Sequence, residues 1–263
     1  MNRIVLWLMI SMVCCSTNGR AASNGGQFGR IPSRIDSRFG PTSPPLWISA
    51  STVVDAQGKL IRESLPELSR MALDLQTSSS DYRVGRCITI SRAEDRAGPM
   101  VKHSNLKDLA QNSLAIVYGT ITDIDQGFSM DVPALLLEVQ IEERLKDADK
   151  YKASDRMYVV YPKADFNVGG YHFCREDANW PEPPKVGDEV MLFPFRSPFD
   201  TAGQVFVPDP EGYEMILERS GSGGIAVPRR LRDDEDLIGV KDLKTVKKYT
   251  LEHLGKMLQR QPR

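Results

Sequence analysis

The feature that most constrains the fold of this 263-residue chain is a strict alternation of side-chain character along residues 133–145. One set of positions is apolar and the other is mostly polar: Leu135, Leu137, Val139 and Ile141 alternate with Leu136, Glu138, Gln140 and Glu142. A period of two residues is typical of a β-strand with one face in the core and the other in solvent. We therefore expect a half-buried strand here, with Leu136 and the polar set toward water.

Further strands are expected on both sides of this one. Residues 114–123 alternate in the same way around Gly119, where a glycine marks a bulge or bend, and the turn residues 125–127 should end that strand. Shorter strands are expected at 157–161, 189–195, 204–207, 213–217 and 225–227, with 204–207 pairing with 189–195 or with 213–217. Parallel strands need crossovers of a dozen or more residues, which this spacing lacks. The pattern predicts a mainly β fold with flanking helices, in which five to six strands form a closed or nearly closed antiparallel barrel.

Helices are expected before and after these strands. A helix is expected to start just after Ser64, with Pro66 near its first turn, and to run through Leu75. Its apolar residues recur at three- and four-residue spacing: Leu68, Met71, Ala72 and Leu75. A short helix at 105–111, capped by Ser104, should bury Leu106, Leu109 and Ala110. A last helix at 240–258 should pack on the barrel or on the N-terminal arm through Leu243, Val246, Thr250, Leu254 and Met257. The acidic run 233–236 before it should be a solvated loop.

The N-terminus indicates export. Arg3 is followed by an apolar run to Val13, which is too short to span a bilayer and has the proportions of a secretory signal. We expect a secreted or periplasmic protein with no stable membrane span in its mature form. Two alternatives stay open, an uncleaved N-terminal anchor and a lipid anchor at Cys14 or Cys15, although Met12 and Val13 are larger than the residues that precede a lipidated cysteine.

These expectations divide the chain into five parts. They are a signal peptide (1–21), a flexible leader (22–45), an arm built from a hairpin and a helix (46–103), the barrel domain (104–230) and the C-terminal helix (237–259).

Signal cleavage beyond Cys15 would leave Cys87 and Cys174. In an oxidising compartment such a pair is expected to form a disulfide, and closing a loop of about ninety residues would stabilise the fold by roughly 4–5 kcal/mol. The alternative is that the cysteines and a histidine bind metal, because His172 and Cys174 would lie on one face of a strand.

Residues 163–184 form a long segment without clear periodicity, and such segments are either functional or disordered. Aromatic residues are enriched at interface hot spots, so the candidate binding residues are Phe166, Tyr171, His172 and Trp180. The alternative is that these residues cover the core as a lid.

Three segments carry a resemblance to a known family: SLAIVYGTI at 113–121, LEVQIEERLK at 137–146 and VGDEVMLF at 186–193. Together they resemble the netrin-like domains related to tissue inhibitors of metalloproteinases. The resemblance implies an OB-type barrel in an exported protein. It does not extend to the inhibitory activity, because that group's inhibitors act through a cysteine at the mature N-terminus and residues 22–45 contain none.

Function is predicted by weighing three hypotheses. The net charge of −1 argues against a general nucleic-acid binder, and no stretch has a cofactor signature. The first hypothesis is an exported, non-enzymatic binding module for a protein or cell-envelope partner. The alternatives are a hydrolase or metal-dependent envelope enzyme built from residues such as His172, Asp165 and Asp177, and a structural component of an envelope assembly.

Overall fold

The computed structural model describes residues 47–90, 105–146, 155–195, 205–206, 212–221 and 224–258. The predicted signal peptide with Cys14 and Cys15, the predicted leader and Ser104 lie outside the described residues.

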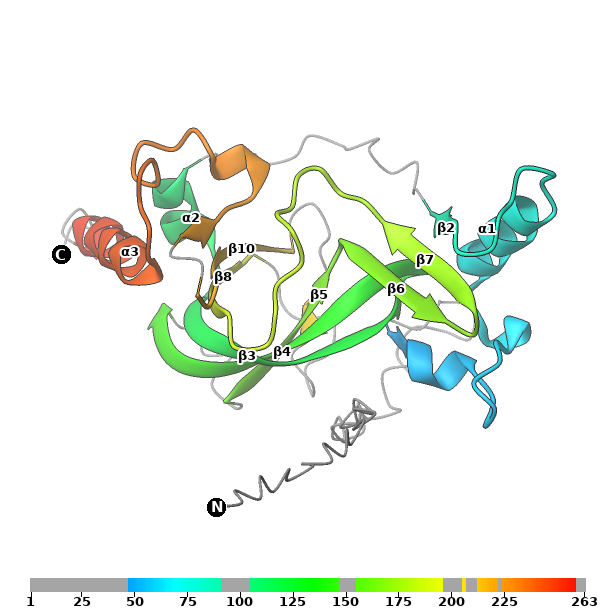
Figure 1. Ribbon diagram of the computed structural model, residues 1–263. Coiled ribbons are helices and arrows are strands. Elements are labelled where there is room, and N and C mark those ends of the chain that lie inside the picture. Colours follow the sequence, from blue (N-terminus) through cyan, green and yellow to red (C-terminus); the bar gives the residue numbers. More distant parts are fainter. Residues whose placement is uncertain are drawn as a thin grey trace, which may run out of the picture. The chain divides into compact units, whose positions relative to one another are not determined.

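An eight-stranded sheet is the centre of the fold (Figure 1). Its order is β11-β10-β8-β3-β4-β5-β9, and β1 also pairs with β3. The strands are β1 (Ile48–Ser49), β3 (Ile116–Ser129), β4 (Val132–Lys146), β5 (Arg156–Tyr161), β8 (Glu189–Pro194), β9 (Val205–Phe206), β10 (Tyr213–Glu218) and β11 (Ile225–Ala226). All pairs are antiparallel except β5 with β9. The prediction of a mainly β, largely antiparallel fold with a C-terminal helix is confirmed.

The long hairpin of β3 and β4 turns at Met130 and Asp131, whose φ angles of 48° and 73° are those of a two-residue hairpin turn. The predicted turn at 125–127 is therefore wrong, since these residues continue β3. Gly127 is required there for another reason: a Cβ atom would collide with the Ile48 carbonyl of β1. The bulge predicted at Gly119 is confirmed by a register shift next to Tyr118.

The solvent-facing side predicted for the 133–145 strand is wrong over the first half of β4. Leu136 and Glu138 are both buried, and so is Val160, which pairs with Leu136 from β5. Glu138 is tolerated inside because it accepts hydrogen bonds from Thr122 and Tyr158 and pairs with Arg156 at 3.0 Å. Alternation along a strand therefore did not reveal that this part of the sheet is covered on both faces.

The described residues do not close the sheet into a barrel. The β5 edge pairs in parallel with β9, through Tyr158 with Val205 and Val159 with Phe206, so the pairing predicted for residues 204–207 is wrong. Side chains connect β5 to β10 instead: the Tyr213 hydroxyl donates to the Val160 carbonyl at 2.7 Å. The Trp180 ring packs on both Tyr161 and Tyr213, with ring centroids 5.3 Å apart in each case.

Residues 163–184 contain a regular hairpin, which the sequence reading missed. Strands β6 (Ala164–Val168) and β7 (Tyr171–Arg175) are joined by Gly169 and Gly170, both with positive φ. Together with β2 (Cys87–Thr89), which runs parallel to β7, they form a second sheet in the order β2-β7-β6.

Among the residues that the structure describes, two hydrophobic clusters flank the main sheet. Alternate residues of β8 divide between them: Val190 and Leu192 belong to the larger cluster, and Met191 and Phe193 to the smaller. The larger cluster also includes the β6–β7 hairpin, while the smaller one lies under α2 (Leu106–Asn112), the 3-10 turn η6 (Arg229–Leu231) and α3 (Leu243–Leu258). The buried residues predicted for α2 are confirmed, although its cap is Asn105 and not Ser104. Helix α3 packs on β8, β10 and α2, which confirms that it covers the sheet.

The 46–61 segment contributes β1 and the 3-10 turn η2 (Ala50–Val53), and a single bridge between Val54 and Leu60 closes the turn at Gly58. A further 3-10 turn, η3 (Arg62–Ser64), leads into α1 (Glu67–Thr77).

Candidate functional site around the disulfide

Helix α1 exposes three of the apolar residues that recur along it at three- and four-residue spacing. Its buried residues are Ser69 and Leu73, and the Ser69 hydroxyl donates to the Asp131 carbonyl at 2.7 Å. Leu68, Met71 and Leu75, by contrast, are 38%, 50% and 70% exposed. We call these three residues the α1 apolar stripe, since spacings of three and four residues place them on one side of the helix.

The chain leaves α1 through an exposed turn, residues 83–86. The Arg86 amide donates to the Arg83 carbonyl, and Gly85 has a φ of 87°, the geometry of a type II turn. Val84 at its tip is 90% exposed, and Arg83 and Arg86 are exposed beside it. The turn therefore presents one apolar side chain between two cations.

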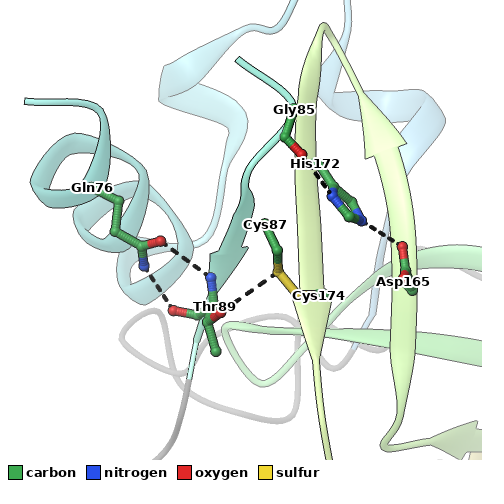
Figure 2. The surroundings of a disulfide bond; sticks show 7 residues. All are labelled: Gln76, Gly85, Cys87, Thr89, Asp165, His172 and Cys174. Atoms are coloured by element: carbon green, nitrogen blue, oxygen red, sulfur yellow. Dashed lines mark hydrogen bonds and ion pairs between the residues drawn. A yellow bond between two sulfur atoms is a disulfide. The ribbon is translucent and has the colours of Figure 1, made fainter. Parts of the chain in front are cut away.

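A disulfide between Cys87 and Cys174 fastens β2 to the β6–β7 hairpin, as predicted. The two Cα atoms are 5.8 Å apart, within the range that a disulfide requires. Figure 2 shows how α1 joins the same unit: the Gln76 side-chain amide donates to the Thr89 carbonyl at 2.8 Å and accepts from the Thr89 amide at 3.3 Å. Helix, turn, β2 and hairpin are thus linked by one covalent bond and a few specific hydrogen bonds.

His172 makes a further link between the turn and the hairpin (Figure 2). Its Nδ1 atom lies 3.2 Å from the Gly85 carbonyl oxygen, and its Nε2 atom lies 2.5 Å from Oδ1 of Asp165 on β6. The hydrogen bond to the Asp165 carboxylate raises the pKa of the His172 ring above its ordinary value, against a smaller opposing effect of burial.

The four predicted binding residues occupy two places. Phe166, Tyr171 and His172 lie on the β6–β7 hairpin, whereas Trp180 packs on Tyr161 and Tyr213. Phe166 is buried with its ring centroid 5.6 Å from that of Phe128, and Trp180 is half-buried on the core. This packing supports the lid interpretation for these two, while a binding role for the four residues stays a prediction.

The residues proposed for an enzyme are only partly together. His172 and Asp165 are in contact, but both ring nitrogens of His172 are engaged, and the Asp177 carboxylate accepts the Asn179 amide in a separate turn. The sulfur of Cys174 is in the disulfide and cannot serve as a thiolate ligand. Within the described part of the chain, no group of three or more His, Cys, Asp or Glu side chains is arranged to hold a metal ion.

Sequence reasoning missed the α1 apolar stripe and Val84 as candidate contact residues. Their spacing was visible, but periodicity shows only that a helix has an apolar face and not whether that face is covered. Val84 could have been noticed as a single large apolar residue in a polar loop.

No protein-family model matches this chain, and no curated protein matches its sequence. Among the helices that the structure describes, none is long and apolar enough to cross a membrane.

Proposed function

We propose that this chain is a non-enzymatic binding module that contacts a protein partner through the α1 apolar stripe and the adjoining turn. The observation that carries the proposal is the exposure of Leu68, Met71 and Leu75 along one side of a helix. Exposed apolar residues grouped in this way are typical of interaction sites, whereas single ones are ordinary surface features. The amphipathic helix is a common element of such contacts.

The attachment of this surface also supports a binding role. The disulfide and the Gln76 contacts hold α1 and β2 against the hairpin before any partner arrives. A surface ordered in advance loses less conformational entropy on binding, which increases affinity. Tyr171 and His172 of the hairpin belong to the same fastened unit and are proposed as additional contact residues.

We further propose that the fold is OB-like and that the protein is exported. The β3-β4-β5 meander, with β8 on the other side of β3 and β10 beyond it, supports an OB-like architecture, which is a partly open barrel in many proteins. The Tyr213 to Val160 hydrogen bond across the open seam supports it as well. The disulfide supports export, because such bonds persist in oxidising compartments.

The test compares two sets of surface variants. One carries Leu68→Gln, Met71→Gln and Leu75→Gln, and the matched control carries Val186→Gln, Ile238→Gln and Leu251→Gln, which are exposed apolar residues elsewhere. Wild-type protein and both variants are immobilised and challenged with the extracellular and envelope fractions, and bound proteins are quantified by mass spectrometry. We expect one partner to be retained by wild type and control and lost with the α1 variant.

If the α1 variant and the control variant retain equal amounts of the partner, the proposal is overturned. A Tyr171→Ala variant, tested in parallel, reports whether the hairpin contributes to the same contact. Sedimentation of the purified protein adds a separate result: self-association abolished by the α1 changes would favour the structural-assembly hypothesis instead.

A further inference from the structure

The surroundings of His172 require a particular protonation state. The Gly85 carbonyl oxygen can only accept a hydrogen bond, and so can an ionised Asp165 carboxylate. Each ring nitrogen therefore faces an acceptor and must carry a hydrogen to form its bond. A neutral imidazole has one N–H group and the imidazolium has two, so both contacts form together only when His172 is charged.

The charged groups on the strands and the turn around His172 are consistent with a protonated ring. Asp165 is the one ionisable group of β6, and it contacts the ring directly. The turn region carries Asp81, Arg83 and Arg86, and the Arg86 guanidinium donates to the Asp81 carbonyl. Strand β7 itself carries Tyr171 and Arg175, and the cysteines of β2 and β7 do not titrate because they are bonded to each other. The nearest charge to His172 is thus the carboxylate that favours its protonation.

We infer that His172 is a pH-sensitive clamp, which holds the turn 83–86 against the β6–β7 hairpin when its ring is protonated and releases the turn when the ring is neutral. The released contact is the one to Gly85, because a carboxylate is a stronger acceptor than a carbonyl and keeps the remaining proton on Nε2. The lone pair of Nδ1 then faces the lone pairs of the Gly85 oxygen, and the two repel each other.

The direction of the pH effect follows from the raised pKa of His172 in the folded protein. A group that binds its proton more tightly when folded contributes stability that is fully present at low pH. That contribution is lost as the pH rises through the folded-state pKa of His172. The clamp is therefore closed in mildly acidic solution and open in mildly alkaline solution.

The disulfide confines the opening to the turn. Cys87 follows Gly85 by two residues and stays joined to Cys174 in both states, while Gln76 keeps the end of α1 on Thr89. Release therefore changes the position of Val84 and its neighbouring arginines without detaching β2. The clamp itself does not depend on the proposed function, although its effect on partner binding rests on that proposal.

An NMR titration of the purified protein without any partner tests the clamp from about pH 5 to about pH 9. The wild type is compared with His172→Gln, Asp165→Asn and the control His253→Gln, which removes the other described histidine that contacts an aspartate. We expect the His172 ring to titrate above the ordinary histidine value of about 6.5. We also expect the amides of Gly85, Arg86 and Cys87 to shift with the same midpoint in wild type and control, and this transition to be absent in His172→Gln.

Asp165→Asn serves as the second variant, since it keeps the ring and removes the carboxylate. This variant should lower the pH midpoint of the His172 ring titration, and the midpoint at which the turn amides shift should fall by the same amount. A wild-type midpoint at or below about 6.5, or turn amides that do not follow the ring, would overturn the clamp. Since no partner is present, either result leaves the proposed binding function to be judged by its own experiment.

Discussion

The helices of this protein are attached to the sheets in two different ways. In the α2–α3 region, Leu106, Leu109, Leu243 and Val246 are fully buried, and the helices form part of a hydrophobic cluster. In the α1 region, the helix buries Ser69 and Leu73 and turns Leu68, Met71 and Leu75 outward. Packing holds both helices of the first region on two or more buried residues each, whereas α1 inserts only one buried apolar residue, Leu73, into the larger cluster and is tied to β2 and the hairpin by hydrogen bonds and a disulfide. The apolar side chains that α1 leaves exposed form the surface through which we propose that a partner binds.

Side chains that are distant in sequence cap the ends of α2 and α3 by forming hydrogen bonds with backbone groups of the terminal turns. The Asp234 carboxylate accepts the Leu106 amide at 2.6 Å, the Lys146 ammonium donates to the Ala110 and Gln111 carbonyls, and Glu218 accepts the Leu243 amide at 2.7 Å. The solvated loop expected at 233–236 is thus wrong for Asp234, which is buried and caps a helix. Each contact places a charge of the favourable sign at a helix end.

Removing the disulfide should produce the largest difference between the two regions. The Cys87→Ser, Cys174→Ser variant should lose roughly 4–5 kcal/mol of unfolding free energy, because its unfolded chain is no longer cross-linked. Urea denaturation measures the loss, and wild type unfolded with a reductant is the control that should match the variant. Hydrogen exchange should rise in α1 and β2 and stay unchanged in α2 and α3. Equal protection loss in all these helices would contradict the distinction between them.

Truncating one leucine in each region tests the packing difference directly. Leu243→Ala on α3 should cost about 2–5 kcal/mol, since it removes fully buried atoms. Leu75→Ala on α1 should change the unfolding free energy by no more than about 0.5 kcal/mol, since the side chain is mostly exposed. Thermal and urea unfolding of both variants provide the comparison. A large cost at Leu75 would mean that the stripe is covered in solution.

Asp234→Ala tests whether a buried carboxylate holds the α2–α3 region. The change should cost about 1–3 kcal/mol, because it leaves the Leu106 amide without an acceptor in a buried site. The matched controls are Asp233→Ala and Glu235→Ala, which alter exposed neighbours in the same acidic run and should be nearly neutral. If all three variants lose the same stability, the effect would come from net charge and not from the cap.

The parts of the fold that follow from local pattern were predictable. Periodicity predicted β5, β8, β10, α2 and α3. The Cys87–Cys174 disulfide was predicted because two cysteines left in an oxidising compartment are expected to pair. The β6–β7 hairpin was predictable too, because Ala164, Phe166 and Val168 alternate with polar residues before a Gly-Gly turn.

The rest depended on contacts between distant residues, which a local pattern does not contain. Whether Leu136 or Leu68 is buried is decided by what covers it, and the pattern is the same in either case. Local pattern likewise does not determine the parallel pairing of β9 with β5, because a short strand could pair with any strand that has an unpaired edge. In the candidate site, the disulfide was predictable, but the contacts of His172 with Gly85 and Asp165 were not, since they join three separate elements.

The smallest predicted effect concerns Gln76, which joins α1 to β2. Gln76→Ala removes both hydrogen bonds to the Thr89 backbone and should cost about 0.5–1.5 kcal/mol. Because the disulfide still holds β2 on β7, the loss should appear mainly as faster hydrogen exchange at the Thr89 amide and in the last turn of α1.

Gln76→Glu keeps an acceptor for the Thr89 amide and loses the donor, so its exchange rates should lie between those of Gln76→Ala and wild type. Gln57→Ala, at an exposed glutamine of another turn, should change neither quantity. Unchanged exchange at Thr89 in Gln76→Ala would show that the disulfide alone positions β2, and that α1 is attached more loosely than these contacts imply.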